Sequence, residues 1–355
     1  MDKPGTMGFR TKLFSLWRNL TYSTIGRLFL FFYILFPIIL KLFPSIFLHT
    51  VFSYKYKGPA VYMRLTNPER DWNFQGASNQ YITSQSGNII GIWHVPPPNA
   101  ENPSLSKAEK VIIYCHGQSG NRASGHRTLF YKVLTNLGFH VVTFDYSGFG
   151  DSTGFPNGRN VELDTISVYA WTIEQLQKTD AIIIVWGHSL GSGIMTYALA
   201  EFSTNQHIQP PHGVVLESPF TSLTEASKSS KAFKLFDIMY PLIWRRIFNS
   251  SMEKHKIEFN TLKNLPKLSS NILILHAEDD PKVNVRLSQE LYDNLMSGSK
   301  TAAKSVHFYK IASKYGLGHN LVYSFKHLKD IMTDFTDVLS GKVISEKVRY
   351  QQITV

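Results

Sequence analysis

The chain has 355 residues, 43% of them hydrophobic and 18% charged, which excludes disorder over most of its length and suits one large or two small domains. Its single cysteine, Cys115, excludes a disulfide framework and a cysteine-based metal site, and we expect no metal or organic cofactor. The net charge of +11 is concentrated in residues 1–50 and 221–268. Both segments are also rich in apolar residues and carry no nucleic-acid-binding motif, so they suit an anionic membrane surface better than nucleic acid.

An apolar stretch near the N-terminus, residues 28–48, is long enough to cross a bilayer as a helix of roughly 31 Å. Pro37 and Lys41 interrupt it, so an interfacial or re-entrant segment remains an alternative. More basic residues precede the stretch than follow it closely, which favours a cytoplasmic N-terminus with the rest of the chain across the membrane. Asn249, in an Asn-Ser-Ser sequon, is a candidate for glycosylation in that orientation.

From about residue 88 the sequence alternates strand-like and helix-like segments, which indicates a mostly parallel sheet with helices on both faces. We divide the chain into a basic arm and membrane anchor at 1–53 and an α/β domain at 54–345. The predicted strands are the apolar, β-branched runs at 89–94, 111–115, 140–145, 181–186, 213–217, 272–276 and 305–309. The predicted helices lie near 126–136, 161–177, 192–203, 286–296 and 324–339.

The motif Gly187-His-Ser-Leu-Gly191 lies between the predicted strand 181–186 and a helix rich in small residues. A strand, Gly-x-Ser-x-Gly and a helix in that order are typical of a nucleophile elbow, a turn so tight that glycine must flank the serine on both sides. Ser189 is therefore the predicted nucleophile.

A serine hydroxyl needs a base to take its proton and a carboxylate to orient that base, in the chain order serine, acid, histidine. An acidic turn, Glu-Asp-Asp, follows a predicted strand, at the sheet edge where α/β proteins place their sites. We favour Asp280 of this turn, on its His-Ala-x-x-Asp-x-x-Val spacing, and keep Asp279 and Glu217 as alternatives. His319, in the loop between the last predicted strand and the last helix, is the predicted base.

Hydrogen-bond donors must also face the oxyanion of the tetrahedral intermediate. The backbone N–H groups of Leu190, next to the nucleophile, and of Gln118, in the loop after the predicted strand 111–115, are the expected donors. No Walker lysine or dinucleotide fingerprint follows that loop, which argues against phosphate binding there.

An aromatic and basic insert at about 220–268 breaks the alternation of strands and helices. In an enzyme of this layout it forms a cap over the active site, and an ordinary pair of surface helices is the alternative. Five side chains of the insert are predicted to contact substrate or membrane: Lys231, Lys234, Trp244, Arg245 and Arg246.

Four stretches of the sequence resemble those of a known protein family. They are Gly138–Tyr146, Trp186–Gly191, Leu216–Thr221 and Leu273–Pro281. With them the chain resembles the α/β-hydrolases, and most closely the group of the α/β-hydrolase domain-containing protein twelve. The resemblance implies an α/β-hydrolase fold and a membrane-anchored lysophospholipase or monoacylglycerol lipase, with lysophosphatidylserine a favoured substrate. It also implies a triad of Ser189, Asp280 and His319.

We therefore expect a single-pass membrane protein, with its catalytic domain in the lumen of the endoplasmic reticulum, that cleaves carboxylic esters of single-chain lipids. Its expected partners are the lipid substrate and the bilayer, and not nucleic acid. A protein acyl-thioesterase, or depalmitoylase, is the alternative within the enzyme class. A catalytically silent lipid-binding or scaffold membrane protein is the alternative from another class.

Overall fold

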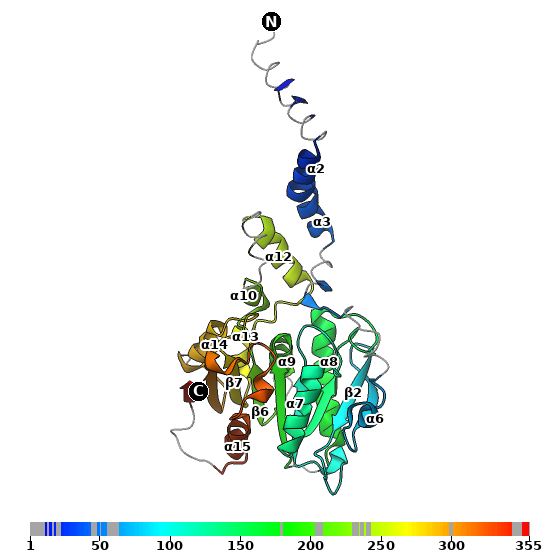
Figure 1. The fold of residues 1–355 in the computed structure, drawn as a ribbon, viewed down its shortest axis with the longest axis vertical. Helices are drawn as coiled ribbons and strands as arrows, with labels where there is room; N and C mark the ends of the chain where they lie inside the picture. Colours follow the sequence, from blue (N-terminus) through cyan, green and yellow to red (C-terminus); the bar gives the residue numbers. More distant parts are fainter. Residues whose placement is uncertain are drawn as a thin grey trace.

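The computed structural model describes most of the chain from residue 64 onward and parts of the N-terminal region (Figure 1). The described residues are 23–43, 48–49, 51–54, 64–177, 180–202, 209–228, 243–297, 301–342 and 350–354, together with residues 11, 12, 14, 15, 18, 234 and 238.

Within these residues, nine strands form one sheet in the order β1-β2-β4-β3-β5-β6-β7-β8-β9. Strand β2 pairs antiparallel with both β1 and β4, and every other neighbouring pair is parallel, so the predicted mostly parallel sheet is confirmed. The strands are β1 (Ser78–Thr83), β2 (Ile89–Val95), β3 (Lys110–Cys115), β4 (His140–Phe144), β5 (Ile182–His188), β6 (Gly213–Glu217), β7 (Asn271–Ala277), β8 (Ser305–Ile311) and β9 (Tyr350–Thr354).

Helices cover both faces of the sheet. One face carries α8, α9 and α14, which share a core with the inward side chains of that face, and the other carries α7 and α15. The central strands are buried on both sides, which is why they are continuous apolar runs and not alternating ones. The helices are α2 (Thr24–Leu30), α3 (Phe36–Leu42), α6 (Pro68–Trp72), α7 (Gly125–Asn136), α8 (Gly158–Gln175), α9 (Leu190–Phe202), α10 (Leu223–Ser227), α12 (Ile243–Lys254), α13 (Thr261–Asn264), α14 (Arg286–Ser297) and α15 (Leu328–Leu339).

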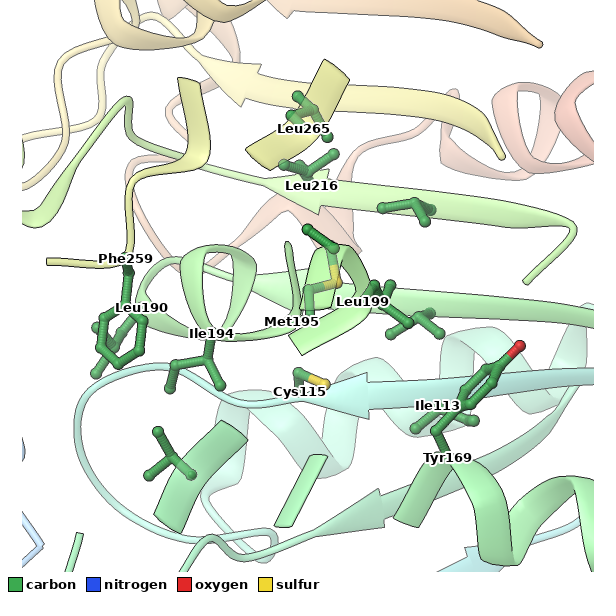
Figure 2. Close-up of a cluster of buried hydrophobic side chains, with 14 of the residues drawn as sticks. Ile113, Cys115, Tyr169, Leu190, Ile194, Met195, Leu199, Leu216, Phe259 and Leu265 are labelled. Atoms are coloured by element: carbon green, nitrogen blue, oxygen red, sulfur yellow. The ribbon is translucent and has the colours of Figure 1, made fainter. Parts of the chain in front are cut away.

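The larger core supports the start of α9. Figure 2 shows Leu190, Ile194 and Met195 of this helix among buried side chains from neighbouring strands, with Cys115 and Leu216 close by. All five side chains are buried in the same core cluster. The turn between β5 and α9 therefore rests on a close-packed base, which restricts its movement.

The predicted strands and helices correspond to β2–β8, α7, α8, α9, α14 and α15, with two kinds of difference. Strands β1 and β9 were not predicted, since both are edge strands with polar sequences, Ser-Asn-Gln-Tyr-Ile-Thr and Tyr-Gln-Gln-Ile-Thr. Helix α15 begins at Leu328 and not near 324, because Val322–Ser324 forms a separate 3₁₀ turn.

The N-terminal apolar stretch is helical in pieces. Helix α2 continues through a π-helical turn at Phe31–Leu35 into α3, where Pro37 occupies the first turn, a position that tolerates proline. Helix α3 lies beside α12 of the insert (Figure 1). Across the described residues, none of the helices combines the length and the apolar character needed to span a bilayer. The single spanning helix predicted over residues 28–48 is thus not confirmed.

The last residue of this stretch and residues just after it belong to the domain core. Leu48, Val51 and Phe52 are buried in the same cluster as the central strands. The domain boundary predicted at residue 53 stays a prediction, but the hydrophobic core already includes residues on its N-terminal side.

Candidate active site

Ser189 lies in the tight turn between β5 and α9, with φ at +53° in the left-handed region that side chains rarely adopt. The flanking glycines explain how the turn closes. A Cβ atom on Gly187 would stand 2.6 Å from the Cα atom of Ser192, and one on Gly191 would collide with the carbonyl oxygen of Cys115. The strained turn leaves the serine hydroxyl at the carboxyl edge of the parallel strands, as the motif predicts.

Three predicted residues meet at this edge. The Nε2 atom of His319 is 2.9 Å from the Oγ atom of Ser189, and its Nδ1 atom is 2.6 Å from Oδ2 of Asp280. Since an ionised carboxylate only accepts hydrogen bonds, Nδ1 of His319 donates to Asp280 and Nε2 is left to accept from the serine hydroxyl. This is the arrangement that allows a histidine to take a proton from serine.

The carboxylate of Asp280 is held from several sides. Its Oδ1 atom accepts hydrogen bonds from the backbone N–H groups of Lys282 and Val283 at 2.8 and 3.0 Å. Its Oδ2 atom lies 3.2 Å from Nε2 of His276 and 2.6 Å from Nδ1 of His319. Burial tends to raise the pKa of Asp280, but the hydrogen bonds from His276 and His319 outweigh it and hold this pKa well below its usual range. The group is therefore a carboxylate at neutral pH.

The neighbouring Asp279 has a different place. Its Oδ2 atom accepts a hydrogen bond of 3.0 Å from the backbone N–H of Gly318. It thus ties the acidic turn to the loop that carries His319, while Asp280 faces the imidazole. Of the two aspartates that the sequence left open, Asp280 has the geometry of the triad acid.

Glu217, the third candidate acid, ends β6 and is buried. Its Oε2 atom accepts a hydrogen bond of 2.8 Å from the indole N–H of Trp186. Burial raises the pKa of Glu217 to about 7. The carboxyl group of Glu217 thus bonds Trp186, whereas the carboxylate beside Nδ1 of His319 is that of Asp280.

The raised pKa of Glu217 predicts how stability depends on pH. Between its ordinary pKa of 4.5 and about 7 the unfolded chain loses this proton while the folded chain keeps it, so stability falls as pH rises through that interval. We expect Glu217→Gln to raise the free energy of unfolding by about 2–3 kcal/mol at pH 8 and by little at pH 4.5. Urea unfolding at both pH values measures this; an equal effect at both, or loss of activity, would contradict it.

Two further histidines contact residues of the predicted triad. His188, next to the nucleophile, has Nε2 2.8 Å from the carbonyl oxygen of His319, so its N–H donates to the backbone of the base. His276 reaches Asp280 and is oriented by Ser288, whose hydroxyl lies 2.6 Å from Nδ1 of His276. The sequence held a signal for His276, because this residue is the first of the His-Ala-x-x-Asp-x-x-Val motif on which Asp280 was chosen.

The loop after β3 faces the elbow. A Cβ atom on Gly117 would stand 3.5 Å from Cβ of Ser189, which places the loop of Gln118 next to the nucleophile. The guanidinium group of Arg127 in α7 donates to the carbonyl oxygens of Ser119 and Asn121, both at 2.6 Å. Leu190 is buried at the first position of α9. The oxyanion roles of the N–H groups of Gln118 and Leu190 stay predictions.

The predicted cap residues are described only in part. Lys231 lies outside the described residues, and Lys234 is exposed. Trp244, Arg245 and Arg246 lie in α12, and their side chains are outside the described part. Asn249 is also in α12 and is exposed, while Ser251 of the same sequon is buried.

Known proteins share this fold and much of this sequence. A family model described as the α/β hydrolase fold matches residues 110–321. Among solved structures, an esterase of Pyrococcus furiosus, Pf2001, superimposes with a TM-score of 0.55 at 18% identity over 78% of this chain and 94% of its own. Est1E of Butyrivibrio proteoclasticus, solved with ferulic acid, gives a TM-score of 0.52 at 16% identity over 74% and 99%. At such low sequence identity, these structural similarities support the fold alone.

Curated proteins are closer in sequence. The lysophosphatidylserine lipase ABHD12 of Danio rerio is 33% identical over 85% of this chain and 80% of its own length. That of Mus musculus is 32% identical over 93% and 82%, and the human protein ABHD12B is 34% identical over 72% of each. The chain therefore belongs to the α/β-hydrolase family, in the group of the ABHD12 proteins, and it is a serine ester hydrolase.

Proposed function

We propose that this protein hydrolyses the carboxylic ester bond of single-chain lipids, either lysophospholipids such as lysophosphatidylserine or monoacylglycerols. The hydrogen-bonded chain from Ser189 through His319 to Asp280, on a strained elbow, carries the proposal. The relatives named as lysophosphatidylserine lipases support the choice of substrate class.

In the proposed reaction, Oγ of Ser189 attacks the acyl carbonyl while Nε2 of His319 takes its proton. The backbone N–H groups of Gln118 and Leu190 stabilise the oxyanion, a contribution worth on the order of 3 kcal/mol for each donor. His319 then protonates the leaving glycerol oxygen, and an acyl-enzyme remains on the serine. Water, deprotonated by His319, releases the fatty acid, and Asp280 keeps the imidazole in the tautomer that each step needs.

A lipid panel tests the substrate class. Wild type and Ser189→Ala are assayed side by side on lysophosphatidylserine, lysophosphatidylcholine, a monoacylglycerol and a palmitoyl-thioester peptide. Serine-dependent hydrolysis of the first three supports the proposal, and the ranking identifies the head group. Activity confined to the thioester would make the protein a depalmitoylase, and no turnover of any of the four substrates by the wild type would contradict the proposed substrate class.

We also propose that the N-terminal helices and the insert contact lipid. The helices α2 and α3 and their connecting turn expose many apolar side chains. Exposure of so much apolar surface is unfavourable in water and favourable in contact with lipid. Helix α12 of the insert lies beside α3, and the insert carries the basic residues. The exposed apolar residues are Ile25, Leu28, Phe29, Phe31, Phe32, Tyr33, Ile34, Leu35, Ile38, Leu42 and Phe43.

Charge neutralisation tests the role of the insert. Changing its four basic residues to glutamine should weaken hydrolysis of an anionic lysolipid in vesicles and reduce its salt dependence, because each basic group contributes roughly 1 kcal/mol near a charged surface. Hydrolysis of a soluble short-chain ester should change little. The four residues are Lys231, Lys234, Arg245 and Arg246.

The matched control neutralises four exposed lysines elsewhere on the domain and should leave both activities unchanged. These are Lys107, Lys132, Lys304 and Lys329. Equal loss on vesicles and soluble ester in the insert variant would mean that its fold is damaged. No loss on either substrate would make the insert ordinary solvated surface.

The proposed topology has the N-terminus in the cytoplasm and the domain in the lumen of the endoplasmic reticulum. In that orientation Asn249, exposed on α12, should carry a glycan, and Asn249→Gln should migrate faster in a gel. The sequon at Asn19, on the other side of the apolar stretch, serves as the control and should stay unmodified. An unmodified Asn249 combined with protease access to the domain from the cytosol would reverse the orientation.

A further inference from the structure

Residues 48, 49 and 51–54, which follow the N-terminal helices, include side chains of the domain core and a contact with the loop of Gln118. Phe52 is 1% exposed and Val51 is 7% exposed, values that belong to the centre of a domain and not to a surface tether. Leu48 lies in the same core cluster. Burial of this kind means that the segment has a fixed position relative to the domain.

The segment makes a backbone contact with the oxyanion loop. The N–H of Ser53 donates a hydrogen bond of 3.1 Å to the carbonyl oxygen of Gln118, and Ser53 and Ser119 form a parallel β-bridge. Fixing the carbonyl of Gln118 restricts the backbone torsions of this residue. The carbonyl lies in the peptide plane of Gln118 and Ser119, and the N–H of Gln118, the proposed oxyanion donor, lies in the preceding plane. The two planes meet at the Cα atom of Gln118, so limiting its torsions limits the range of directions open to that N–H.

The side chain of Phe52 contacts two aromatic residues, one near the loop of Gln118 and one near the start of α9. Its ring meets the rings of Phe149 and Phe259 edge-on, with centroids 6.4 and 6.3 Å apart. Phe149 in turn packs on His116, two residues before Gln118, at 5.0 Å between centroids.

Phe259 leads to the other half of the oxyanion site. A Cβ atom on Gly193 would stand 3.0 Å from Cβ of Phe259, so Phe259 packs against the first turn of α9. Leu190, the other proposed donor, opens that helix. Phe52 is thus linked through Phe149 and His116 to the loop that carries Gln118, and through Phe259 to the first turn of α9, which Leu190 opens.

We propose that residues 51–54 position the oxyanion site. The N–H of Ser53 holds the carbonyl of Gln118, and the ring of Phe52 packs through Phe149 and Phe259 against the loop and the helix that carry the two donors. Together these contacts keep the N–H of Gln118 facing the developing charge. This inference rests on the proposed function, since it assigns a support to the proposed donors. It makes the N-terminal region a part of the catalytic apparatus, in addition to any part in lipid contact.

Two pairs of variants test the proposal in the full chain, in detergent micelles, on a water-soluble short-chain ester. Ser53→Pro removes the donating N–H, whereas Ser53→Ala keeps it. Phe52→Ala removes the ring, whereas Phe52→Leu retains most of the buried volume. Active-site titration with a fluorophosphonate counts the competent molecules in each sample, and thermal melting reports the fold.

We expect kcat of Ser53→Pro and Phe52→Ala to fall about ten-fold or more, as weakening of an oxyanion donor does, with KM within about two-fold. Ser53→Ala should retain most of kcat, and Phe52→Leu should lie between wild type and Phe52→Ala. A short-chain trifluoromethyl ketone forms a tetrahedral adduct that needs the same donors, so its inhibition constant should rise as kcat falls. The pH profile of kcat should keep its shape, because the pair of His319 and Asp280 is untouched.

Folded Ser53→Pro and Phe52→Ala with wild-type kcat and inhibition constant would overturn the proposal. A fall in kcat without a matching rise in the inhibition constant would also overturn it. If Ser53→Pro does not fold, the two Phe52 variants decide by the same criteria. Ser189→Ala is run in parallel: if it retains activity on the ester, the proposed function fails, whereas an inactive Ser189→Ala beside unaffected Phe52 and Ser53 variants removes this inference alone.

Discussion

Ser189→Ala is expected to abolish labelling by a fluorophosphonate probe and to lower lipid hydrolysis by about 10⁴-fold or more, because the members of a triad act as a unit. The hydroxyl removed is the one 2.9 Å from Nε2 of His319, on the strained turn between β5 and α9. His319→Ala should be nearly as severe, since the serine then has no base within reach. Probe labelling and turnover on a lysophospholipid measure both effects.

Ser192→Ala is the matched control. This serine is buried in α9, three residues after Ser189, and its hydroxyl donates to the carbonyl oxygen of Ser189 and not to His319. It should keep probe labelling. Thermal melting of Ser189→Ala should show a folded protein. If folded Ser189→Ala keeps more than a few per cent of wild-type turnover, the nucleophile is a different residue.

The strands that could be predicted from the sequence are those that are buried on both faces of the sheet. Strands β3, β5, β6 and β7 are covered on both faces, so their sequences are short apolar runs that stand out from the chain. The edge strand β1 carries no such signal, because much of its surface meets solvent and its residues are mostly polar. The strand β1 forms because its backbone hydrogen-bonds to β2, and this pairing is not visible in the sequence of β1 itself.

The catalytic residue types could also be predicted, because the Gly-x-Ser-x-Gly turn and the loop positions at the strand ends are local features. The sequence favoured Asp280 over Asp279 by its spacing alone, and it left the alternative open because neighbouring residues in one turn differ by the direction of their side chains. The role of His276 was missed for a related reason. Its contact with Asp280 depends on a bend of the chain that folds the turn back over the end of β7.

Residues 48–54 show a further limit of sequence reasoning. Their apolar side chains continue the N-terminal stretch and so were divided between a membrane anchor and the start of a domain. Apolar composition alone does not distinguish burial in lipid from burial in a protein core, since both environments exclude water. The aromatic partners of Phe52, at Phe149 and Phe259, lie far along the chain, and only the fold brings them together.

Asp280→Asn is expected to lower kcat by about 10³–10⁴-fold, whereas Asp279→Asn should cost only a few-fold. An amide at position 280 can donate to Nδ1 of His319, which favours the tautomer that cannot accept the proton of Ser189. An amide at position 279 keeps an oxygen for the N–H of Gly318, so the loop of the base stays in place. Steady-state kinetics on a soluble ester compares the two.

Acid stability gives an independent measurement on the same pair. The pKa of Asp280 is depressed in the folded protein, so its ionised form contributes stability that is present above the unfolded pKa of about 3.9 and is lost as pH falls through the folded value. Asp280→Asn lacks this contribution, and its unfolding free energy should change less between pH 6 and pH 3 than that of the wild type. Asp279→Asn should follow the wild-type profile more closely. If Asp279→Asn were instead the variant with the lower kcat and the flatter acid profile, Asp279 would be the acid that orients His319.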